Sequence, residues 1–261
     1  MRQDRRSICV PFRLVFTVNL VYQVTVVGLN PLQLVLVGTV LEATAFLFEI
    51  PTGIVADMYS RRASIIIGIF ITGASFILQG LAPRFEAILL SQVIWAIGYT
   101  FTSGATEAWI SDEIGEANAG RAFLRAAQVA QIAGIAGIAI SVALAQIAIM
   151  LPIIAGGAVF IALGARLVLA MPERGFKPAT RADRATYQKF TDTLRGGIAM
   201  TRTRPILLTI FAVTAIYGAF SESFDRLSRA HLLNDIGVPP IGALQPVTWF
   251  GVFEIVGMVL S

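Results

Sequence analysis

Residues 49–62 read EIPTGIVADMYSRR, and they join two long apolar segments of the chain. Gly53 has no side chain to keep a neighbouring helix at a distance. Asp57, at the end of the first segment, is placed to meet the positive N-terminus of another helix. Arg61 and Arg62 lie in the turn, where they can pair with acids or with lipid phosphates. Such a cluster can hold two helical bodies together and release them.

The composition of the whole chain is that of a membrane protein. Of the 261 residues, 56% are hydrophobic and 14% are charged, whereas an average soluble domain carries about 25% charged residues. A soluble domain has too little interior to bury so many apolar side chains. The net charge of +4 comes from basic residues between the apolar segments. We therefore expect membrane lipids, and not nucleic acid, as the partner.

Long apolar runs alternate with connections along the chain, and most of these connections are short. A helix needs about 20 apolar residues to cross the hydrocarbon core, and it satisfies its own backbone hydrogen bonds in lipid. The sequence therefore predicts an all-α membrane protein with seven complete spans and part of an eighth. These spans cover residues 8–27, 32–55, 63–81, 85–110, 121–145, 148–171, 205–230 and 247–261.

One long basic connection divides the predicted helices into two sets. Residues 172–204 hold eight basic and three acidic side chains. Residues 1–171 then form a six-helix half, and residues 205–261 form the first two helices of a second half. Within the connection, apolar residues from Tyr187 to Ile198 recur at helical spacing, which predicts either an amphipathic helix on the membrane surface or a solvated linker helix. Because Ser261 lies inside an apolar run, we expect a partial chain.

Lys and Arg mark the cytoplasmic loops of membrane proteins. The N-terminus, the turn at 57–62 and the long connection carry most of the basic residues. The sequence therefore predicts a multi-pass protein of the cell (inner) membrane with a cytoplasmic N-terminus.

The turn resembles the signature loop of the major facilitator superfamily, which reads Gly, three residues, Asp, a basic residue, any residue, Gly and two basic residues. The matching positions are Gly53, Asp57, Arg61 and Arg62. Met58 replaces the usual basic residue, and Ser60 replaces the usual Gly. Glu49-Ile-Pro-Thr before the turn, and residues 103–112 (SGATEAWISD) at the end of the fourth span, strengthen the resemblance. The likeness is to members related to bacterial drug-efflux facilitators.

The resemblance implies a fold of two six-helix halves that rock about a central substrate site. Gly53 and Asp57 would belong to a cytoplasmic gating latch between the halves, in which Arg61 or Arg62 pairs with an acid such as Asp112. The implied activity is secondary active transport of a small solute. Export of amphipathic or drug-like compounds is the leading hypothesis, and uptake of a metabolite is the alternative.

Two departures weaken the case for proton antiport. Many proton-coupled relatives carry an Arg in the outer part of the fourth span, where this chain has Gln92. The antiporter signature of the fifth span places Pro after Gly, whereas Gly134 and Gly137 stand here without Pro.

Ionisable and polar residues inside spans are candidates for a substrate or proton site, because charge in lipid is costly. Glu42 is the leading candidate for a proton carrier and could also attract a cation; the alternative is a neutral carboxyl hydrogen-bonded to a neighbouring helix. Asp225 is alternatively a structural partner of Arg226. Polar groups in the first span could line a cavity or join helices. The full set of candidates is Asn19, Tyr22, Gln23, Glu42, Glu49, Glu107, Glu222 and Asp225.

Other classes of function find little support in the sequence. There is no G-x-x-x-x-G-K-[ST] phosphate loop, no H-E-x-x-H and no recognisable Ser/His/Asp arrangement, so neither an ATP-driven pump nor a membrane enzyme is predicted. With one Cys and one His, we expect no metal site of the usual kind and no cofactor. A non-transporting helical scaffold or remnant is the remaining alternative.

Overall fold

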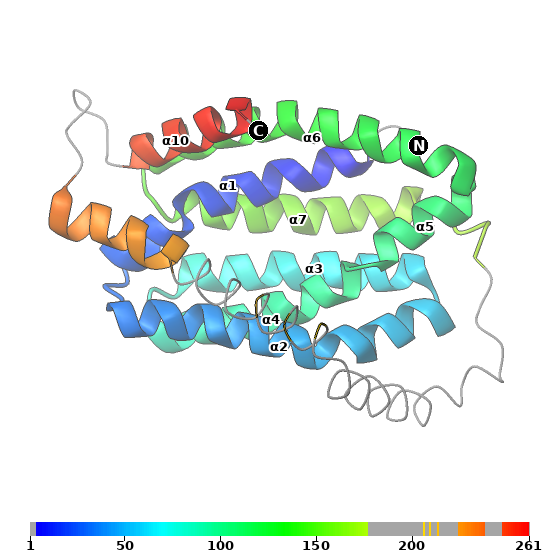
Figure 1. Cartoon of the computed structure of the whole chain (residues 1–261), viewed down its shortest axis with the longest axis horizontal. Coiled ribbons are helices and arrows are strands. Elements are labelled where there is room, and N and C mark those ends of the chain that lie inside the picture. Colours follow the sequence, from blue (N-terminus) through cyan, green and yellow to red (C-terminus); the bar gives the residue numbers. More distant parts are fainter. Residues whose placement is uncertain are drawn as a thin grey trace.

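The computed structural model describes residues 4–176, 224–237 and 247–260, together with single helical positions at 206, 209 and 213. These residues form a helical bundle (Figure 1) in which no strand occurs. The helices are α1 (Asp4–Thr25), α2 (Pro31–Met58), α3 (Arg61–Leu81), α4 (Phe85–Thr102), α5 (Ala105–Ile114), α6 (Glu116–Ala145), α7 (Leu151–Ala170) and α10 (Val247–Leu260). Residues 224–231 are helical too, and the π-helical turn η2 covers Leu232–Ile236.

Five of the described spans are long and apolar enough to cross a membrane: α2, α3, α4 together with α5, α6 and α7. α1 has 22 residues and is more polar, because it carries Arg13, Asn19 and Gln23. The all-α membrane fold predicted from the sequence is confirmed.

Two boundaries differ from the prediction. The span expected at 85–110 consists of two helices, because the chain breaks at Gly104, whose φ of +66° favours glycine. Gly115, with φ of +78°, ends α5 and starts α6 at Glu116 rather than at residue 121. The amphipathic helix expected around residues 187–198 and most of the span expected at 205–230 lie outside the described residues.

α3 is the central helix, and it packs along α4 on one side and α7 on the other. A Cβ on Gly98 would lie 2.8 Å from the carbonyl oxygen of Gly68, and one on Gly157 would lie 2.7 Å from that of Gly73. These glycine pairs bring the helix backbones into direct contact. Small residues at such positions are typical of helix packing in lipid.

The two ends of the bundle differ in the number of arginines. Consecutive spans run in opposite directions, with α4 and α5 together forming one span, so the start of α1, the α2–α3 turn and the ends of α5 and α7 lie at one end, on the right of Figure 1. We call this the basic end, because it holds Arg61, Arg62, Arg121, Arg125 and Arg174. The opposite end is called the far end; the helix 224–231, orange in Figure 1, lies there.

The contact between α3 and α7 is tight enough to be tested by adding one methyl group. Gly157→Ala should lower the unfolding temperature in detergent, by an overpacking cost of about 1–3 kcal/mol. Gly120→Ala on α6 is the matched control, because a Cβ there meets no atom of the described residues within 4 Å. It gains the same helix propensity and should unfold at or above the wild-type temperature. Equal unfolding temperatures for the two variants would contradict the close backbone approach.

Candidate functional site

The α2–α3 turn is built around Ser60, the residue that replaces the glycine of the resembled signature. Its backbone is extended, and its hydroxyl accepts a hydrogen bond from Ala63 N at 2.9 Å. Ser60 is therefore the N-cap of α3, a role that serine fills better than glycine. The same hydroxyl donates to Glu173 Oε2 at 2.7 Å. Ser60, in place of the glycine of the signature, thus connects the turn to Glu173 in the segment after α7.

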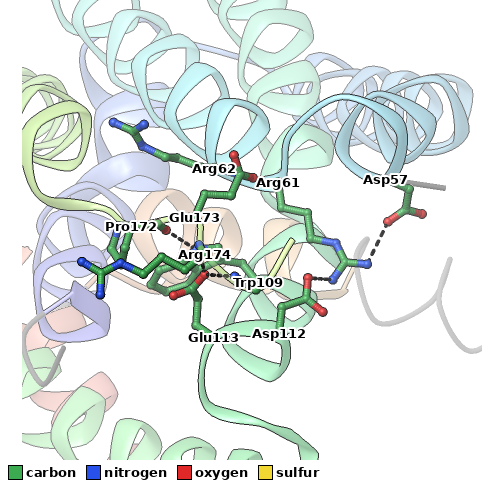
Figure 2. A network of polar contacts seen from close by, with 10 residues as sticks. Asp57, Arg61, Arg62, Trp109, Asp112, Glu113, Pro172, Glu173 and Arg174 are labelled. Atoms are coloured by element: carbon green, nitrogen blue, oxygen red, sulfur yellow. Dashed lines mark hydrogen bonds and ion pairs between the residues drawn. The ribbon is translucent and has the colours of Figure 1, made fainter. Parts of the chain in front are cut away.

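Arg61 joins α2, α3 and α5 through its guanidinium (Figure 2). Its Nη1 pairs with Asp112 on α5, and its Nη2 lies 3.4 Å from Asp57 Oδ1 on α2. The Asp112 and Arg61 side chains are 27% and 20% exposed, whereas the Asp57 side chain is 62% exposed. The contact with Asp112 is therefore shielded from solvent and strong, and the contact with Asp57 is solvated and weak.

Arg62 makes no ion pair with an acid in the described part of the chain. Its Nη2 donates to the Val168 carbonyl in the last turn of α7, where a cation meets the negative end of a helix. Its backbone N–H donates to Glu173 Oε1 at 3.0 Å. Glu173 thus places a carboxylate on the N-terminus of α3, which the helix dipole favours.

The segment Pro172–Phe176 crosses the basic end, and we call it the strap. Trp109 Nε1 donates to the Pro172 carbonyl at 2.8 Å. Glu113 Oε1 accepts from the backbone nitrogens of Arg174 at 2.5 Å and Gly175 at 2.8 Å. The strap thereby fixes the end of α7 to both α3 and α5 (Figure 2).

Two cavities share a wall of aromatic rings inside the bundle. The aromatic cluster has ring centroids 4.9–6.4 Å apart. Its members are Phe12 and Phe16 from α1, Phe76 from α3, Trp95 from α4 and Phe160 from α7. Phe12 and Phe160 line a cavity of about 350 Å³, the basic-end cavity, whereas Phe16 and Trp95 line one of about 180 Å³, the far cavity.

The basic-end cavity is mostly apolar, and its lining includes the polar residues Thr102 and Ser103 and the predicted candidate Glu107. The far cavity lies between α1, α4 and the helix 224–231. Its lining residues are Phe16, Asn19, Leu20, Gln23, Trp95, Asp225, Arg226 and Arg229.

A buried amide cluster ties α1, α3 and α4 together beside the far cavity. Asn19 Oδ1 accepts from Gln23 Nε2 at 3.1 Å and from Gln79 Nε2. Tyr22, which is buried, donates from its hydroxyl to the Gln79 carbonyl at 2.8 Å. Gln92 Nε2 lies 3.4 Å from Gln79 Oε1. Tyr22 and Gln92 therefore act in helix packing and line neither cavity.

The remaining predicted residues are spread over the bundle. Glu42 and Glu49 are exposed on α2, and Glu49 accepts from Ser103 Oγ at 2.8 Å. No atom of the described residues lies within 4 Å of a Cβ built on Gly53, so the close approach predicted there is not made by them. Glu222 lies outside the described residues. Among the described residues, no three His, Cys, Asp or Glu side chains form a group that could hold a metal ion.

Sequence reasoning missed several contact residues. Ser60 was noted only as a departure, and Glu173 only as one charge of the long connection. The signal for Glu173 was its position directly after the sixth span, where an acid can reach the arginines of the turn. Sequence reasoning gave Glu254 no partners. It accepts from Thr17 Oγ1 at 2.8 Å and lies 3.8 Å from both Arg13 and Arg229; no spacing in the sequence joins these residues.

Comparison with known proteins gives consistent matches. The family described as Major Facilitator Superfamily matches residues 11–261. The uncharacterized MFS-type transporter YxaM of Bacillus subtilis (strain 168) is 31% identical over 98 residues, which are 38% of this chain and 25% of that protein.

A solved structure is similar over nearly the whole chain. It is the crystal structure of a bacterial homologue of the human lysosomal transporter Spinster, in an inward-facing and unoccupied conformation, with a TM-score of 0.63 and 18% identity. The match covers 99% of this chain and 61% of that one, so the chain spans about three fifths of its structural relative. At this identity the likeness concerns the fold alone.

The strap depends on a glycine at position 175, because a Cβ there would overlap the backbone carbonyl of Asp112. Gly175→Ala should displace the strap and cost its hydrogen bonds to Glu113, which are worth about 1.5–3 kcal/mol each when the acceptor is charged. We expect tryptic cleavage after Arg174 to become at least about tenfold faster, since 1.4 kcal/mol corresponds to a factor of ten. Gly120→Ala should be cleaved at the wild-type rate. Unchanged cleavage of Gly175→Ala would show that the strap is not held by these contacts.

Proposed function

The chain belongs to the major facilitator superfamily, and from this premise we propose that it is a secondary active transporter that moves a small solute by alternating access. The family supplies the general activity, transport across a membrane. The two cavities and the charged network at the basic end support the specific mechanism. Because the chain spans only part of its structural relative, the proposal concerns the protein together with the helices that would complete a second half.

The arrangement of the two cavities suits a protein that exposes its site to one side at a time. The aromatic cluster lies between residues that line the basic-end cavity and residues that line the far cavity. A shared wall of large rings prevents the two cavities from joining into a continuous pore. In alternating access the solute passes this wall as one half moves against the other, with only one of the two sides open at a time.

The observation that carries the proposal is the uneven pairing of Arg61. Its shielded partner, Asp112, holds the guanidinium against α5. Its solvated partner, Asp57, is bound by a contact of about 0–1 kcal/mol, so that carboxylate is available to a helix N-terminus of a second half. We propose that Asp57 latches the two halves at the basic end when the protein faces outward. Arg62 and Glu173 hold the start of α3 to the end of α7, so that the turn carrying Asp57 keeps its position.

The lining of the basic-end cavity favours an amphipathic solute. Its walls are mostly apolar, with Tyr99 and Phe160 as large rings and Glu107 as a carboxylate. Export of drug-like compounds fits this lining better than uptake of a strongly polar metabolite. If protons are the coupling ion, Glu107 is a better candidate for the proton carrier than Glu42, because Glu107 lines the basic-end cavity and Glu42 lines neither of the two cavities described above.

We also propose that the basic end faces the cytoplasm of the cell membrane, with the N-terminus inside. The support is the excess of arginine at that end and the rule that basic loops stay in the cytoplasm.

The latch predicts a variant that folds but does not transport. Asp57→Asn removes an exposed charge, so the unfolding temperature should stay at the wild-type value, while dye export from proteoliposomes should fall at least about tenfold, or about 1.4 kcal/mol. Glu86→Gln removes an exposed carboxylate at the far end and should transport normally. Export by Asp57→Asn at the wild-type rate would remove the latch role.

Orientation can be tested with single cysteines in a Cys9→Ser background. Tyr59 is 71% exposed in the α2–α3 turn, and Arg84 is exposed at the far end. A membrane-impermeant maleimide should label Arg84→Cys in intact protoplasts and label Tyr59→Cys only after lysis. The reverse pattern would place the basic end outside.

A further inference from the structure

We propose that the far cavity binds the anionic group of an organic acid, with Arg229 as the residue that receives the charge. The inference rests on the proposed transport function and names a substrate class for it, namely small amphipathic anions with an aromatic or other apolar body. Unpaired polar atoms, the local charge and the aromatic wall each support it.

Two buried polar atoms beside the far cavity have no partner among the described residues: Gln23 Oε1 and Trp95 Nε1. The Gln23 side chain is 1% exposed, and its amide nitrogen is already used by Asn19. Leaving such an atom without a hydrogen bond in the protein interior is unfavourable. A bound solute would remove this cost if it presents an acceptor to the Trp95 N–H and a donor, or a bridging water, to the Gln23 oxygen.

Arginine side chains contribute to the lining of the far cavity. Arg226 and Arg229 line it together with Asp225, and Glu254 lies next to Arg229 and Arg13. Guanidinium groups bind carboxylates through charge-assisted hydrogen bonds, so an anionic group that enters the cavity would find a matching partner there.

Arg229 is the arginine best placed to receive that anion. Its Nη1 lies 3.8 Å from Glu254 Oε1, which is longer than a charge-assisted hydrogen bond of about 2.7–2.9 Å. Glu254 is shared with Arg13, also at 3.8 Å, and accepts from Thr17 at 2.8 Å. The side chain of Arg229 is 41% exposed. Glu254 therefore orients Arg229 without saturating it.

The aromatic side of the cavity fits the apolar body of such an anion. Phe16 and Trp95 have ring centroids 5.1 Å apart, and both rings form the wall beside the polar atoms. The volume of about 180 Å³ is below the roughly 300–1,000 Å³ of pockets for drug-sized ligands. A body of about one ring with one anionic group fits this space.

Three probes of nearly equal shape and different charge test the class: benzoate, benzamide and benzamidinium. Binding to the purified protein in nanodiscs of neutral lipid would be measured by ligand-observed NMR titration. We expect benzoate to bind the wild type at least about tenfold more tightly than benzamide, and benzamidinium to bind most weakly. Arg229→Gln should abolish the preference for benzoate while benzamide binds as before, which shows that the variant is folded. Arg229→Lys should retain part of the preference.

Arg84→Gln is the matched control, because it removes an exposed arginine that does not line the far cavity, and it should bind benzoate like the wild type. Equal affinity of the wild type for benzoate and benzamide, or a benzoate preference that survives Arg229→Gln, would overturn the anion site. Asp57-dependent dye export, measured in parallel, separates the two proposals. If the wild type exports dye but does not prefer benzoate over benzamide, the transport proposal stands and only the substrate class is wrong.

Discussion

The close contact of α3 with α4 and α7 is the constraint on which the other features of the structure depend. In lipid, the hydrophobic effect does not drive helices together, so association needs tight packing and hydrogen bonds. The glycine pairs 68/98 and 73/157 let the three backbones touch. α3 then contributes a residue to several of the contact groups described above. Its first turn holds Arg61 and Arg62, its middle holds Phe76 of the aromatic cluster, and its last turns hold Gln79 of the amide cluster.

This arrangement separates contacts that stay fixed from contacts that can exchange. Buried and shielded groups, such as Gln79 and the Arg61–Asp112 pair, are costly to break because the partner would be left unsatisfied. Exposed groups such as Asp57 lose little free energy when they exchange one ion-pair partner for another. In the proposed mechanism, the buried contacts hold the first half together so that it can move as a rigid body. The exposed groups on its surface are the ones that exchange partners.

The sequence predicted the helices because apolar length alone decides whether a segment spans a membrane. It also named Asp112 as a possible partner for Arg61 or Arg62, and in the structure Asp112 pairs with Arg61. It missed the breaks at Gly104 and Gly115, because a positive φ does not interrupt the hydropathy pattern. It missed Glu173, Gln79 and Glu254 for another reason: their partners are distant in sequence, and only the packing of α1, α3 and α10 brings them together.

The balance of charge in the membrane links the two ends of the molecule. At the basic end, Arg61 is paired with Asp112 and Arg62 with the end of α7. An anionic solute bound there would therefore add little electrostatic stabilisation. The described lining of the far cavity includes Asp225, Arg226 and Arg229, and Glu254 is shared by Arg13 and Arg229. An anion that enters there would add a negative charge next to α1 and α10, the helices that Glu254 joins. Neutralising Arg229 would weaken its contact with Glu254 and so loosen α10 from the helix 224–231. Thr17 and Arg13 would still hold Glu254 to α1, so binding of the solute would change the packing within the second set of helices while the link between α1 and α10 remains.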